Sequence, residues 1–132
     1  MHVNWWKLTL ALLLGILLTG VVGAQEGVWQ GEQGHPMLRA TLRAKDKNAQ
    51  KHAALVEVET QNVGLVSLDV SYGGSDVGLL EYQVDQGPVL ATTDTEAMFR
   101  DLTPGKHTIT VSLVTTEYKD LGAKAELEVD IP

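Results

Sequence analysis

The chain contains no cysteine among its 132 residues. This absence excludes disulfide-stapled toxins and growth factors, cysteine-ligated zinc sites, thiol nucleophiles and a lipoprotein anchor on cysteine. The chain also lacks a phosphate-binding glycine loop, an H-E-x-x-H motif, a D-x-D-x-D-G calcium loop and a G-x-S-x-G elbow. Aromatic residues make up only 5% of the chain, which disfavours an aromatic sugar-binding platform. Together these absences predict that the protein is not an enzyme.

The first 24 residues have the pattern of a secretory signal peptide. Lys7 precedes an apolar run, and small residues at Val22 and Ala24 are what signal peptidase accepts before the cleavage site. The pattern predicts a mature chain that begins near Gln25 and is exported to the periplasm, the cell surface or the medium. An alternative stays open, because the 18 mostly apolar residues of 5–22 are close to the minimum for a membrane helix. In that case the segment remains as an uncleaved anchor, which is the only membrane contact predicted.

Charge is distributed unevenly along the chain. Without the first 24 residues the chain has 9 basic and 17 acidic residues, a net charge of −8. The segment 39–51 has a net charge of +4, whereas 53–132 has a net charge of −10. Such an acidic body disfavours nucleic acid and anionic lipid, so the predicted partner is a protein or a small ligand.

From residue 53 onward, apolar and polar residues alternate with a period of two, the pattern of half-buried strands. The alternation predicts strands at 54–59, 66–72, 80–85, 88–92, 96–101, 108–113 and 124–131. A further strand is predicted at 37–44, followed by a polar loop, and the Gln-, Glu- and Gly-rich segment 25–36 is predicted as a flexible lead-in. Thr103-Pro104-Gly105-Lys106 has the composition of a type II turn. The predicted fold class is therefore all-β: an antiparallel two-sheet sandwich over 37–132, preceded by an N-terminal signal helix.

Two stretches of this sequence are similar to a known class of module. Leu80–Pro88 reads LEYQVDQGP, and Phe99–Val111 reads FRDLTPGKHTITV. Both resemble the strand-and-turn motifs of bacterial immunoglobulin-like and fibronectin type III-like modules, which implies an immunoglobulin-like sandwich. The chain also resembles small exported bacterial proteins of unknown function that consist of one such sandwich. Some of these have metal-binding histidines, of which only His107 has a counterpart here.

Three sets of residues are candidate metal ligands. Acidic side chains near the predicted turns would supply the oxygens that calcium prefers: Asp76, Asp85, Asp94, Glu96, Asp101, Glu117 and Asp120. His35 and Met37 offer an imidazole and a thioether, which copper accepts. His107 has two interpretations. It is either a metal ligand or proton acceptor, or a corner histidine that forms a hydrogen bond to the backbone beside the Pro-Gly turn.

The function predicted from these patterns is a non-enzymatic, exported, immunoglobulin-like binding or structural module of the cell envelope or extracellular space, with no cofactor. The first alternative is an exported metal-binding protein that holds calcium at the acidic turns, or copper. The second is a small hydrolase, which requires a pocket where two or more titratable groups converge.

Overall fold

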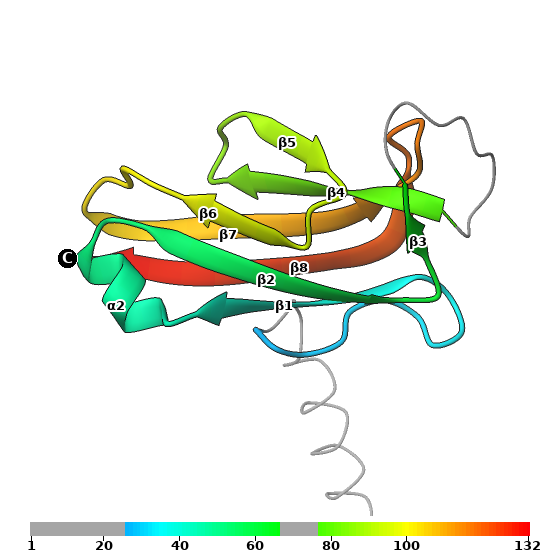
Figure 1. The fold of residues 1–132 in the computed structure, drawn as a ribbon, viewed down its shortest axis with the longest axis horizontal. Helices are drawn as coiled ribbons and strands as arrows, with labels where there is room; N and C mark the ends of the chain where they lie inside the picture. The colour runs from blue at the N-terminus through cyan, green and yellow to red at the C-terminus, as the bar shows by residue number, and fades with distance from the viewer. Residues whose placement is uncertain (1–25, 67–76) are drawn as a thin grey trace, which may run out of the picture.

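The computed structural model describes residues 26–66 and 77–132, which form two β-sheets and one short helix (Figure 1). The elements in chain order are β1 (Met37–Arg43), α2 (Lys45–Gln50), β2 (Ala54–Gln61), β3 (Gly64–Leu65), β4 (Val77–Val84), β5 (Val89–Thr92), β6 (Glu96–Phe99), β7 (Gly105–Val114) and β8 (Asp120–Ile131). The all-β, two-sheet architecture predicted from the alternating pattern is confirmed.

The first sheet has the order β1-β2-β6 and is antiparallel throughout. The second has the order β3-β4-β7-β8, with β5 also paired to β4. Only the short pairing of β3 with β4 is parallel among the strand pairs of the described residues. In Figure 1, β5 lies at the margin of the molecule beside β4, and β7 separates β4 from β8.

The core lies between the two sheets and contains alternate residues of their strands. In β8 every second side chain from Ala123 to Ile131 is buried, and the charged residues between them are exposed. Leu38 and Val56 of the first sheet belong to the same buried cluster as Tyr82 and Leu127 of the second. Fully burying one such aliphatic side chain is worth about 1.5–3 kcal/mol, so this cluster holds the sheets together.

The segment after β1 differs from the prediction. A polar loop was expected there, but Lys45–Gln50 forms the helix α2. Ala44 has a φ of 45°, which turns the chain out of β1, and Asn48 Nδ2 donates a hydrogen bond to Arg43 O at 2.7 Å. Lys, Ala and Gln favour helix, and the buried side chain of Ala49 packs α2 against the core. Six residues are too few to reveal a helical period in sequence.

The described part of the predicted lead-in lies along β1. Gly27 N donates to Ala40 O at 2.8 Å, and Gln30 exchanges two backbone hydrogen bonds with Leu38. Glu26 Oε1 accepts a hydrogen bond from Leu42 N at 2.9 Å. These contacts cover the outer edge of β1, so residues 26–30 are hydrogen-bonded to the first sheet.

Some predictions fall on residues outside the described ranges. These are the signal helix with its alternative as an anchor, the strand at 66–72 beyond its first residue, and the candidate ligand Asp76. Between residues 26 and 66 and from 77 to 132, no helix has the length and apolar character needed to cross a membrane.

Candidate functional site

The turn after β4 carries a carboxylate that binds the start of β7. Asp85 has a φ of 53°, a left-handed conformation that Asp adopts more readily than most residues. Its Oδ1 accepts a hydrogen bond from Thr108 N at 2.9 Å, and its own N–H donates to Thr108 O at 2.7 Å. The carboxylate therefore continues the pairing of β4 with β7 beyond the end of β4.

His107 completes a polar corner, which consists of Asp85, Thr103, His107 and Thr108. Its Nδ1 lies 2.7 Å from Asp85 Oδ2, and its Nε2 lies 2.6 Å from the backbone oxygen of Thr103. The side chain is only 11% exposed, while that of Asp85 is 47% exposed. The hydrogen bond to the backbone beside the Pro-Gly turn is the one expected of a corner histidine. The corner thus joins the β4–β5 turn to the β6–β7 turn.

Hydrogen bonds favour the charged form of both groups of the pair. The hydrogen bond from Thr108 N, followed by that from His107, keeps the pKa of the Asp85 carboxyl below its ordinary value. The hydrogen bond to Thr103 O, followed by that to Asp85, raises the pKa of His107. Each ring nitrogen faces an acceptor, an arrangement that suits an imidazolium with a proton on both nitrogens.

This corner has the parts of a catalytic triad but not the required geometry. Thr103 Oγ1 lies 3.3 Å from His107 Nε2, so an acid, an imidazole and a hydroxyl are adjacent. The Thr103 carbonyl, however, lies closer to the same nitrogen and can only accept a hydrogen bond. Nε2 therefore carries a proton and has no lone pair to take one from the hydroxyl, as a general base must.

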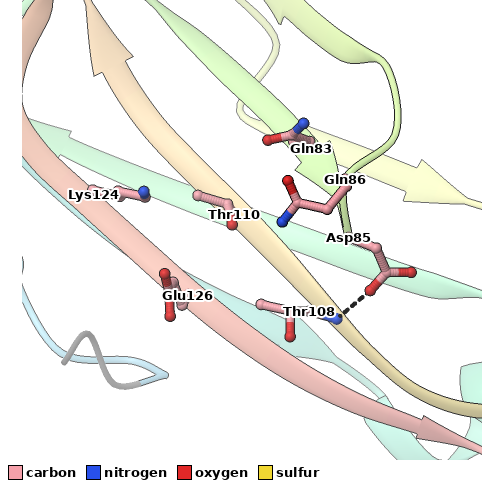
Figure 2. Close-up of a pocket in the computed structure, with 7 residues that line it drawn as sticks. All are labelled: Gln83, Asp85, Gln86, Thr108, Thr110, Lys124 and Glu126. Carbon is pink, nitrogen blue, oxygen red and sulfur yellow. Dashed lines mark hydrogen bonds between the residues drawn. The ribbon is translucent and has the colours of Figure 1, made fainter.

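A shallow depression of about 400 Å³ lies on the outer face of the second sheet, next to this corner. Figure 2 shows its polar side chains, which come from β4, the β4–β5 turn, β7 and β8. The lining residues are Gln83, Asp85, Gln86, Thr108, Thr110, Lys124 and Glu126. The depression offers amides, hydroxyls and charges of both signs, and it contains no aromatic side chain.

The structure separates most of the candidate metal ligands. Asp85, Asp101 and His107 lie near the start of β7, whereas Glu117 and Asp120 lie beyond its far end. A ten-residue strand such as β7 spans about 30 Å. Among the residues that the structure describes, no three His, Asp or Glu side chains are grouped closely enough to hold a metal ion.

The remaining candidates have other surroundings. Glu96 is the first residue of β6 and Asp94 lies two residues before it. Asp94 O accepts a hydrogen bond from the buried Tyr82 hydroxyl at 2.7 Å. Burial raises the pKa of that hydroxyl. The His35 ring is exposed at 3.9 Å from Glu32, and Met37 is the half-buried first residue of β1.

No local sequence pattern points to His52, which also contacts the β6–β7 turn. Its Nδ1 lies 3.1 Å from Leu102 O, and Leu102 N donates to His52 O at 2.9 Å. Two histidines thus bind consecutive carbonyl groups of one turn, His52 at Leu102 and His107 at Thr103. Contacts between residues some 50 positions apart leave no local pattern that sequence reasoning can detect.

A second candidate site is the outer edge of β5. Val89 is 53% exposed and Leu90 is 50% exposed, although both belong to a strand. In the part of the chain that the structure describes, β5 pairs with β4 alone. The edge therefore presents apolar side chains together with unpaired backbone groups.

No protein-family model, curated protein or solved structure matches this chain.

Proposed function

We propose that this chain is a non-enzymatic, exported module with an immunoglobulin-like or fibronectin type III-like sandwich, and that it binds a partner protein at the edge of β5. The observation that carries the proposal is this edge, which is apolar, uncharged and exposed. Export is proposed on the signal-like pattern of residues 1–24.

The strand order supports the immunoglobulin-like assignment. In immunoglobulin domains the first, second and fifth strands share one sheet, and the third, sixth and seventh strands share the other. Leaving out the two-residue β3, the order β1-β2-β6 against β4-β7-β8 follows this division. The fourth strand, β5, pairs with β4 instead of β6, which leaves it at the sheet margin.

A comparison of β5 with β8 indicates why β5 is the binding edge. Both strands have one paired neighbour within the described residues. β8 has charged side chains at every second position from Lys124 to Asp130, which discourage pairing with another chain. The segment Val89–Thr93 has no charge at all. An exposed edge without such protection is a template for pairing with another chain.

The polar corner supports a binding module over a hydrolase. Asp85 and His107 are used to join two turns, and His107 Nε2 is already committed to a backbone carbonyl. The neighbouring depression is open and lined by polar groups, without an activated nucleophile among the described residues.

The proposal is tested by site-specific photo-crosslinking in the cell that exports the protein. A photoreactive amino acid is placed at Leu90, and in a matched variant at Tyr118, which is 54% exposed but lies in the β7–β8 turn. We expect a discrete protein adduct from position 90 and none from position 118. No adduct at position 90, or the same adducts from both positions, would overturn the proposed function.

A further inference from the structure

We propose that the partner of β5 is an extended segment of another protein that adds as a further strand to the second sheet. The segment has apolar side chains on both of its faces and is flanked by basic residues. This inference rests on the proposed function and names the chemistry of its partner.

Hydrogen bonds at the end of β4 determine which groups of β5 are free. Asp85 N donates toward β7, at Thr108 O, while Val84 O accepts from Gly87 N on the side of β5. Because backbone groups alternate in direction along a strand, Tyr82 and Leu80 direct their N–H and C=O groups toward β5.

The register then assigns the outward-facing groups. Tyr82 pairs with Leu90, and Leu80 pairs with Thr92, so Leu90 and Thr92 form the hydrogen bonds to β4. The N–H and C=O groups of Val89 and Ala91 consequently point away from the sheet. Two residues with free donors and acceptors on one edge are a template for an incoming strand.

The side chains of β5 provide apolar contacts on both faces of that strand. Val89 is opposite Gln83 and lies on the outer face, whereas Leu90 is opposite the buried Tyr82 and lies on the face toward the core. An added strand would cover both half-exposed side chains, because successive residues of a strand point to opposite faces. This arrangement requires a partner with apolar residues on each face.

Charge selects a basic partner over a second copy of this chain. The segment 77–101 contains five carboxylates and one guanidinium, a net charge of −4. Glu81, which pairs with Ala91 in the register, and Asp94, which follows β5, form no salt bridge within the described residues. A second copy would bring another segment with the same net charge of −4 to this edge, whereas lysines or arginines beside the added strand would be attracted to the carboxylates.

The test uses a synthetic peptide and the protein purified after export. The probe is a fluorescent peptide whose central residues are valine and isoleucine, so that both faces of the added strand are apolar, and it has two lysines at each end. The matched control peptide has glutamate in place of lysine. Fluorescence anisotropy measures binding, and sedimentation measures the oligomeric state of the protein alone.

Two protein variants distinguish strand addition from nonspecific binding of the peptide. Ala91→Pro removes only an outward N–H group and keeps the hydrogen bonds to β4, a position where an edge strand tolerates proline. We expect it to weaken binding of the lysine peptide about fivefold or more, with a melting temperature close to that of the wild type. The double variant Glu81→Gln/Asp94→Asn should weaken the lysine peptide and reduce its preference over the glutamate peptide.

The outcomes distinguish the two proposals. Strand addition by a basic segment is supported if the wild type prefers the lysine peptide, Ala91→Pro binds that peptide more weakly, and Glu81→Gln/Asp94→Asn shows a reduced preference for it. Three results would overturn strand addition by a basic segment. These are an affinity of Ala91→Pro for the lysine peptide equal to that of the wild type, an equal affinity of the wild type for both peptides, and a dimer of the protein alone. If position 90 nevertheless forms a specific adduct in the cell, the proposed function stands and only the mode of binding is wrong. If position 90 forms no adduct, the proposed function itself fails.

Discussion

At the scale of single residues, Asp85 is the group on which the corner depends. Its carboxylate accepts from both Thr108 N and His107 Nδ1. Asp85→Asn keeps a residue that tolerates the left-handed conformation but removes the charge. We expect the free energy of unfolding to fall by about 1 kcal/mol, since water screens the half-exposed carboxylate. Urea unfolding measures this difference. Asp101→Asn, at another exposed left-handed position, is the control and should change little.

The same pair predicts a dependence on pH. The pKa of His107 is raised above its ordinary value of 6.5, so its stabilising contribution is complete below 6.5 and is lost as pH rises through the folded-state pKa. The pKa of Asp85 is lowered from 3.8, so its contribution is present above 3.8 and is lost as pH falls through its folded-state pKa. The stability gap between the wild type and Asp85→Asn should therefore be widest between 3.8 and 6.5. A gap that widens at alkaline pH would contradict the assignment of an imidazolium.

At the scale of elements, Gly78 permits β4 to pass close to β7. A Cβ atom at this position would lie 2.5 Å from Val114 O and 3.0 Å from Leu121 Cδ1. Val114 lies at the register shift where β7 and β8 depart from regular pairing, so this carbonyl projects toward β4. Gly78→Ala should lower the free energy of unfolding by about 2 kcal/mol, because backbone and core must move apart.

A graded comparison tests that explanation. Gly87→Ala would place a Cβ atom 3.1 Å from Val84 O, a milder approach to a carbonyl. We expect this variant to lose less than about 1 kcal/mol, as measured by thermal unfolding. Equal losses in the two variants would show that the close approach at β7 is not what requires Gly78.

At the scale of the whole molecule, the proposed export predicts that the N-terminal segment is removed. The described structure begins at Glu26, which is hydrogen-bonded to Leu42 N at the end of β1. Cleavage after Ala24 would leave Gln25 and this anchored residue as the new N-terminus. Intact mass measurement of the exported protein should show the loss of the first 24 residues. A mass equal to the full 132-residue chain would instead support the membrane anchor.

Also at this scale, local alternation determined the sheet-forming segments and their buried faces. Ala125, Leu127, Val129 and Ile131 are buried as their spacing predicts, because side-chain direction in a strand depends only on position along it. Such patterns require no knowledge of neighbours. Gly105, which was predicted to lie in a turn, is the first residue of β7, and its positive φ of 116° is a conformation that glycine adopts readily.

Only the tertiary structure decided which of these strands pair and which of their side chains come into contact. Asp85 and His107 are 22 positions apart, and only the pairing of β4 with β7 makes them partners. Turn residues that looked alike in sequence lie at opposite ends of β7, because a strand of that length separates the two ends of a sandwich. The exposure of Val89 and Leu90 likewise follows from the position of β5 at a sheet margin, since the number of neighbours of a strand is a property of the assembled sheet.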